Sequence, residues 1–80
     1  MTRAEIVAGI AEVARRHVGW EGELGESARL VEDLGLDSMR LLVLAAEVEN
    51  RFRVALSPED DARVRTVGDL ARLVEERLGG

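Results

Sequence analysis

Residues 33–39, Asp-Leu-Gly-Leu-Asp-Ser-Met, lead into a run of regularly spaced apolar residues that ends at Phe52. Gly35 permits a tight turn with positive φ, and either Asp37 or Ser38 can cap the helix that follows. Apolar residues spaced by three and four positions predict the buried face of this helix. That face comprises Leu41, Ala45, Val48 and Phe52, widened by Leu42 and Leu44. A capped amphipathic helix entered through a glycine turn therefore organises the fold.

Three further helices are predicted from capping signals and apolar periodicity. Thr2 and Glu5 have the spacing of a capping box, Ser57-Pro58 is typical of the start of a short helix, and Thr66 can cap the last helix. The expected buried stripes are Ile6, Ile10, Val13 and His17 in the first helix and Val67, Leu70, Val74 and Leu78 in the last, which Gly79-Gly80 end. We therefore predict an all-α fold, a small helical bundle of three longer helices plus one short helix, with a long loop between the first and second.

The long first loop is punctuated by Gly19, Gly22 and Gly25. Loops of this length are uncommon unless they are functional or packed by their own side chains. The side chains available for such packing are Trp20, Leu24, Leu30, Val31 and Leu34. No linker or internal repeat divides the chain, so residues 1–80 are expected to form a single, free-standing domain.

Composition excludes several classes of function. The 80-residue chain has a net charge of −5, no cysteine and one histidine, and all eleven basic residues are arginine. Mild acidity without a basic block argues against binding of nucleic acid or anionic membrane. Thiolate nucleophiles, cysteine-based metal sites and lysine Schiff bases are impossible, and one histidine cannot form a multi-histidine metal site. Without a signal peptide or spanning segment, we expect a cytoplasmic protein. A chain this small has a thin core, which argues against a deep catalytic cleft and therefore against enzymatic activity. The exclusive use of arginine is typical of GC-rich bacterial genomes.

Ser38 is the polar residue with the most informative position. At a helix start its hydroxyl would lie in solvent beside backbone N–H groups that lack helical partners. A phosphate ester there would meet the positive end of the helix dipole. A nucleophilic role lacks a nearby base, because His17 is expected on the stripe of the first helix, and the G-x-S-x-G elbow is absent. The cap alone leaves two interpretations open, a plain helix cap and a serine that bears a phosphate group.

Residues 34–39 and the apolar helix after them resemble the attachment motif of acyl carrier proteins. The resemblance continues through residues 57–60 and 66–70 and covers nearly the whole chain. It implies that a Mg²⁺-dependent phosphopantetheinyl transferase adds 4′-phosphopantetheine from coenzyme A to Ser38. The thiol of that arm would carry acyl groups as thioesters, so the reactive sulfur belongs to the cofactor. Asp37 matches the acidic neighbour of the family serine, which contacts the transferase or positions the phosphate region, and plain capping is its alternative role.

The resemblance also implies partners: the transferase and acyl-activating, condensing or acyl-transfer enzymes that meet a monomeric carrier. Arg40 and Val43 stand where family members often carry acids, and we predict docking through Met39, Arg40, Val43 and Glu47. Partial burial in the core is the alternative role of Met39. This departure favours a specialised pathway, such as polyketide or lipopeptide synthesis, over primary fatty acid synthesis. Leu36 stands where peptidyl carriers usually have a second glycine, which favours acyl cargo. A peptidyl or aminoacyl carrier, a non-carrier helical adaptor and a small hydrolase stay as alternatives.

Other candidate groups have structural interpretations. Residues 59–61, Glu-Asp-Asp, lack EF-hand spacing and fit the acidic first turn of a helix. His17 is interpreted as a packed or dipole-favoured residue, and Trp20 as an anchor of the loop on the bundle. Gly9 and the alanines at 45–46 leave room either for close helix packing or for an acyl chain.

Overall fold

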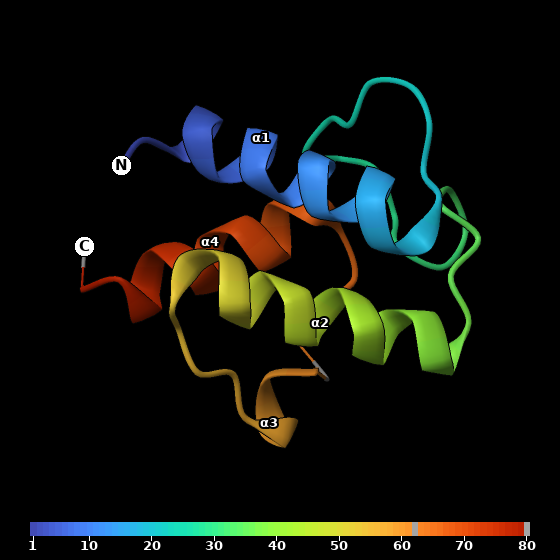
Figure 1. Ribbon diagram of the computed structural model, residues 1–80. Coiled ribbons are helices and arrows are strands. Elements are labelled where there is room, and N and C mark those ends of the chain that lie inside the picture. Colours follow the sequence, from blue (N-terminus) through green and yellow to red (C-terminus); the bar gives the residue numbers. More distant parts are fainter. Residues whose placement is uncertain (62, 80) are drawn as a thin grey trace.

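The computed structural model describes residues 1–61 and 63–79, which form helices joined by loops (Figure 1). The elements are α1 (Arg3–Val13), the π-helix η1 (Ala14–Val18), α2 (Ser38–Phe52), α3 (Pro58–Asp61) and α4 (Val67–Arg77). The described residues form no strand; their one β-type pairing is an isolated antiparallel bridge between Arg29 and Thr66. The predicted all-α fold with three longer helices is confirmed. Gly80, expected to help end the last helix, lies outside the described residues.

The first and last helices begin at the caps that the sequence predicts. Thr2 Oγ1 accepts a hydrogen bond from the Glu5 N–H at 3.2 Å, and the Glu5 carboxylate accepts one from the Thr2 N–H at 2.7 Å. Thr66 and Asp69 make the same reciprocal pair before α4, at 3.1 Å in each direction. Each pair satisfies two backbone N–H groups at a helix end. Both helix starts are therefore set by residues close in sequence.

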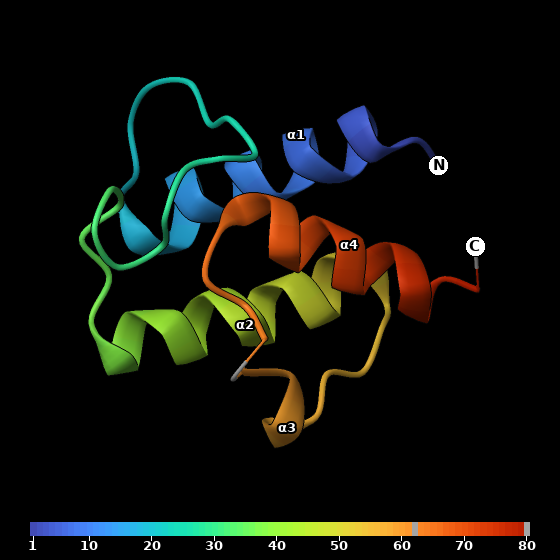
Figure 2. The same cartoon turned by 180° about the vertical axis from the view of Figure 1, so that it is seen from behind.

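A continuous apolar core joins α1, α2 and α4, and α1 packs against both other helices (Figures 1 and 2). Its largest fully buried side chains are Ile6, Ile10, Leu44, Val48, Val67 and Val74. All six belong to the apolar stripes predicted from helical spacing, and their burial supplies the main stabilisation of the bundle. In the described part of the chain, no helix has both the length and the apolar character needed to cross a bilayer.

Several residues expected in the core lie at the surface instead. Leu42 is 66% exposed, and Leu78 and Val31 are also exposed. Leu42 lies in the first half of α2, and Leu78 follows the end of α4. His17 is exposed because the first helix widens to a π-helix at Ala14. A π-turn holds more residues than an α-turn, so later side chains rotate away from the buried stripe.

The connection between η1 and α2 is held on the bundle by both side chains and backbone. Trp20, Leu24 and Leu34 pack against the core, and Leu30 is buried. The Leu30 N–H donates to the Arg65 carbonyl at 2.9 Å, and the Val67 N–H donates to the Ala28 carbonyl at 2.9 Å. The interpretation of Trp20 as a loop anchor is confirmed. The segment that leads to α2 is therefore fixed against the start of α4.

Candidate functional site

The turn before α2 is built from backbone hydrogen bonds around Gly35. The Gly35 N–H donates to the Val31 carbonyl at 3.0 Å, and the Leu36 N–H donates to the Leu30 carbonyl at 3.2 Å. Gly35 has a φ of 70°, in the left-handed region where a side chain would be strained. Leu36 is buried in the core directly after this turn. The chain is thus held in place just before it enters α2.

Asp37 is the N-cap of α2. Its Oδ1 accepts a hydrogen bond from the Arg40 N–H at 2.9 Å, and its carbonyl accepts one from the Leu41 N–H at 2.9 Å. Its backbone is extended, with φ −89° and ψ −179°, as expected for a residue at the helix boundary. Of the two predicted caps, Asp37 takes the role and Ser38 becomes the first helical residue. The geometry supports the capping interpretation of Asp37.

Ser38 is exposed at the start of α2, directly after the cap. The first backbone N–H groups of a helix have no acceptor within the helix, so they point toward the space beside this residue. The positive end of the helix dipole also lies here and favours an anionic substituent. The hydroxyl is therefore accessible to another protein in a place that suits a phosphate ester.

His17 is not placed to activate Ser38. Its Nε2 lies 3.5 Å from an oxygen of Glu47, farther along α2. At about 1.5 Å per residue, that pair is roughly 13 Å along the helix from Ser38. No three His, Asp or Glu side chains among residues 1–61 and 63–79 come together as a possible metal site. His17 therefore does not serve as the base that a nucleophilic mechanism at Ser38 would need.

An apolar pocket of about 340 Å³ lies beside Ser38, between α2, α3 and α4. Ser38 itself forms part of the lining, so the pocket begins at the start of α2. The other lining residues are Leu41, Leu42, Leu44 and Ala45 from α2, and Leu30, Leu56, Asp60, Val64, Leu70 and Leu73 from the surrounding segments. The site thus combines an exposed hydroxyl with an adjoining space that can take an apolar chain.

The small residues of the first and second helices have separate roles. Ala45 lines the pocket and leaves room there, whereas Ala46 is exposed. Gly9 lies against Phe52, and a Cβ on Gly9 would come within 2.5 Å of the Phe52 ring. Of the two interpretations, Gly9 thus allows close packing of α1 on α2, and Ala45 borders the pocket.

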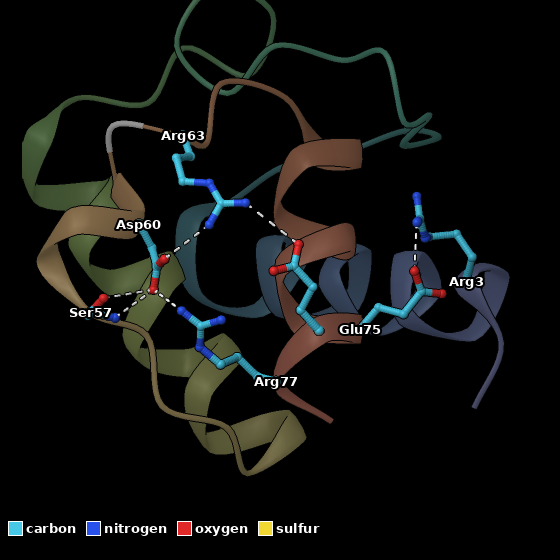
Figure 3. A network of polar contacts seen from close by, with 7 residues as sticks. Arg3, Ser57, Asp60, Arg63, Glu75 and Arg77 are labelled. Atoms are coloured by element: carbon cyan, nitrogen blue, oxygen red, sulfur yellow. Dashed lines mark hydrogen bonds and ion pairs between the residues drawn. The ribbon is translucent and has the colours of Figure 1, made fainter. Parts of the chain in front are cut away.

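Asp60 forms the polar part of the pocket wall, which sequence reasoning missed. It is 5% exposed, and Ser57, Arg63 and Arg77 point toward it (Figure 3). Its Oδ2 accepts hydrogen bonds from the Ser57 N–H at 2.9 Å, the Ser57 hydroxyl at 3.0 Å and Arg77 Nη2 at 2.7 Å. These donors, above all the backbone N–H of Ser57, hold the pKa of Asp60 below its ordinary value of 3.8. The buried carboxylate is therefore ionised at neutral pH.

The Asp60 carboxylate also fastens α3 to the last turn of α4. Arg63 lies 3.8 Å from Asp60 Oδ1 and 3.7 Å from Glu76 on α4. The prediction that residues 59–61 are simply acids of a first turn is incomplete, because Asp60 is buried and the side chain of Asp61 lies outside the described part. Ser57 and Asp60 have the spacing of a capping box, which is the signal that points to the contact.

Three of the four predicted docking residues share one exposed surface of α2. Met39 is 73% exposed, and Arg40 and Val43 are exposed beside it. Leu42 belongs to the same surface, since residues three and four positions apart are neighbours on a helix. We call Met39, Arg40, Leu42 and Val43 the α2 patch. Glu47 differs because its carboxylate is partly buried and one of its oxygens lies 3.5 Å from Nε2 of His17 in η1.

Comparison with known proteins gives consistent relatives. Residues 4–74 match the family described as a phosphopantetheine attachment site. The chain is 35% identical over 77 residues to the meromycolate extension acyl carrier protein of Mycobacterium leprae, covering 95% of this chain and 67% of that protein. It is 33% identical over 79 residues to the acyl carrier protein of Thermotoga maritima, covering 98% of each. A solved structure of a candidate acyl carrier protein from Mycobacterium tuberculosis matches with a TM-score of 0.82 and 31% identity, over 89% of this chain and 96% of that one.

Proposed function

Because the chain belongs to the acyl carrier protein family, whose cofactor is 4′-phosphopantetheine, we propose that Ser38 is the residue that bears this group. One observation carries the proposal: Ser38 is an exposed hydroxyl at the first position of a capped helix, at the edge of an apolar pocket. A modifying enzyme can reach such a hydroxyl without unfolding the bundle. A chain attached there can turn into the pocket or outward to a partner.

The residues around Ser38 fit a phosphodiester. The N-terminal N–H groups of α2 and the helix dipole favour the negative charge, and Asp37 holds the first turn in register. In the proposed modification, Ser38 Oγ gives up its proton and forms the new bond to phosphorus, and the adenosine bisphosphate part of coenzyme A leaves. The bound group supplies a terminal thiol for thioesters, which the cysteine-free chain itself lacks.

The pocket beside Ser38 supports acyl cargo. Leu41, Leu44 and Ala45 offer apolar contacts next to the attachment point, so an alkyl chain gains by leaving water. The relatives that match are acyl carriers, which favours acyl cargo over aminoacyl cargo. Family membership also argues against the alternatives of a non-carrier adaptor and a hydrolase. Tethering raises the effective concentration of cargo at each partner enzyme, which is how such a protein would act without catalysis of its own.

The α2 patch is the proposed docking surface for the transferase and for acyl-activating, condensing or acyl-transfer enzymes. Met39, Leu42 and Val43 are apolar, and Arg40 places a positive charge among them. A complementary partner would present an apolar surface with an acidic group opposite Arg40. Glu47 has a smaller part in docking, because its carboxylate is partly buried and lies 3.5 Å from the His17 ring of η1. A patch of this character favours dedicated partners, as in polyketide or lipopeptide synthesis.

The proposal is tested by intact mass after incubation with coenzyme A, Mg²⁺ and a promiscuous phosphopantetheinyl transferase. Wild-type protein should gain one phosphopantetheinyl group, and Ser38→Ala should gain none. Ser27→Ala is the matched control, because Ser27 is also an exposed serine and lies in the first loop. Wild-type protein that stays unmodified while a control carrier is loaded, or modification that persists in Ser38→Ala, would overturn the assignment.

A further inference from the structure

A purely apolar cargo leaves one feature of the pocket unexplained. Apart from Ser38 at the edge, Asp60 is the polar residue among the described side chains that line it. It is 5% exposed, and burial of a charged group is costly unless its hydrogen bonds are made. Asp60 therefore places a charged residue at one definite position in an otherwise apolar wall.

The two oxygens of this carboxylate differ in how they are satisfied. Among the described residues, the donors to this carboxylate are the Ser57 N–H and hydroxyl and Arg77, and all three donate to Oδ2. The nearest cation to Oδ1 is Arg63 Nη1 at 3.8 Å, which is beyond hydrogen-bond distance. Each carboxylate oxygen can accept about two hydrogen bonds, so Oδ1 keeps its capacity as an acceptor.

We propose that the pocket is adapted to an acyl chain that carries a hydroxyl group, which donates a hydrogen bond to Asp60 Oδ1. The inference rests on the proposed attachment of the cofactor to Ser38. A hydroxyl supplies a donor for this oxygen, and the rest of the chain remains in contact with leucine and valine side chains. The residue thus determines which cargo the pocket holds, and takes no part in bond making.

The surroundings of Asp60 select among polar groups. Arg77 at 2.7 Å and Arg63 at 3.8 Å already balance the carboxylate charge, so a cargo ammonium group would face two guanidinium groups. A ketone has no proton to donate, and a cargo carboxylate would be repelled by Asp60. A neutral donor is the group that fits, which again favours hydroxyacyl over aminoacyl cargo.

The test compares cargoes of one length on the full-length protein. A promiscuous phosphopantetheinyl transferase loads octanoyl, oxo-octanoyl and hydroxyoctanoyl arms from the corresponding coenzyme A thioesters, with the substituent at carbon 3, 5 or 7. Hydroxylamine cleavage of each thioester measures how well the pocket protects the cargo. Backbone amide chemical shifts of Ser57 and Asp60, measured by NMR, report contact at the proposed position. At one of the three positions, the hydroxyl should lengthen the thioester half-life roughly tenfold over octanoyl and oxo-octanoyl.

Two variants separate the acceptor from the fastening of α3. In Asp60→Asn, the donors from Ser57 and Arg77 turn the amide oxygen toward themselves and leave the NH₂ at the position of Oδ1. The variant should then protect oxo-octanoyl at least as well as the hydroxy cargo. Arg77→Gln weakens the tie between α3 and α4 and leaves Oδ1 unchanged, so it should keep the hydroxyl preference.

The outcomes distinguish this inference from the proposed function. Failure to load any arm contradicts attachment at Ser38 and with it the inference. Loading of every arm with equal half-lives leaves the carrier function standing and overturns the hydroxyl preference. A preference that survives Asp60→Asn, or that both variants abolish equally, also overturns it, because Oδ1 would not be its source.

Discussion

Removal of the cap at Asp37 separates two roles that this residue can have in modification of Ser38. Asp37→Ala deletes one hydrogen bond, the 2.9 Å contact to the Arg40 N–H, at an exposed helix start. Loss of such a cap typically costs about 1 kcal/mol. For a domain of this size that corresponds to a decrease in Tm of about 4–8 °C. The same energy shifts the equilibrium between a formed and a frayed first turn about fivefold.

The assay combines thermal unfolding by far-UV circular dichroism with the initial rate of phosphopantetheine loading at 25 °C. Asp37→Asn keeps a side-chain oxygen that can cap, so its Tm and loading rate should stay close to wild type. Asp37→Ala should show the stated decrease in Tm and accept phosphopantetheine up to about fivefold more slowly, because its first turn frays. Thr66→Ala is the matched control, since it removes a cap of comparable length from α4, away from Ser38. Thr66→Ala should show a similar decrease in Tm and accept phosphopantetheine at the wild-type rate.

Two results would contradict the capping argument. If Asp37→Asn keeps its Tm and loads as slowly as Asp37→Ala, the charge of Asp37 contacts the transferase directly. If Thr66→Ala slows loading as much as Asp37→Ala, the rate follows global stability and not the first turn of α2. The structure predicts neither result, because the carboxylate is already used by the Arg40 N–H.

Three further predictions concern stability, each measured by urea denaturation. Gly9→Ala should lose about 1–2 kcal/mol, because crowding against Phe52 at 2.5 Å outweighs the gain in helix propensity; a stabilised variant would contradict this packing. Leu44→Ala should lower the free energy of unfolding by about 2–5 kcal/mol and Leu42→Ala by less than about 0.5 kcal/mol, since only Leu44 is buried. Equal losses would mean that Leu42 packs in the core. The lowered pKa of Asp60 gives stability that is present above its ordinary pKa of 3.8 and lost as the pH falls through the folded-state value. Asp60→Asn should therefore be less stable than wild type at neutral pH and lose less stability between about pH 5 and pH 2. An acid-induced loss of stability equal to that of wild type would contradict the lowered pKa of Asp60.

Local signals predicted the elements of the fold and the position of Ser38 because each depends on residues close in sequence. The glycine turn at Gly35, the cap at Asp37 and the stripe through Val48 need no knowledge of other helices. Leu42 could not be placed in the same way. Its spacing is that of a core residue, but it borders the pocket between α2, α3 and α4 and is 66% exposed. Helical periodicity identifies the apolar face of a helix, but it does not show how much of that face contacts neighbouring helices.

The missed features of the site arise from contacts between distant segments. His17 left its expected stripe because η1 is a π-helix, for which the sequence carries no clear spacing signal. Asp60 meets Arg77 only once α3 folds back on α4, so its burial does not follow from its neighbours in the chain. The capping-box spacing of Ser57 and Asp60 indicates a local hydrogen bond and cannot show that the carboxylate reaches a pocket.

The two sides of the pocket are held by different forces, and this decides which side can adjust to cargo. The α2 side is anchored by Leu44 and Val48, whose burial in the core resists displacement. The α3 side has four helical residues, too few for a stable helix on its own, and is held by the Asp60 pairs with Arg77 and Arg63 together with the half-buried Leu56 and Val64. Pairs with exposed arginine partners stabilise weakly compared with a packed core. A pocket that enlarges should therefore move α3 while Ser38 and the α2 patch keep the geometry that partner enzymes meet.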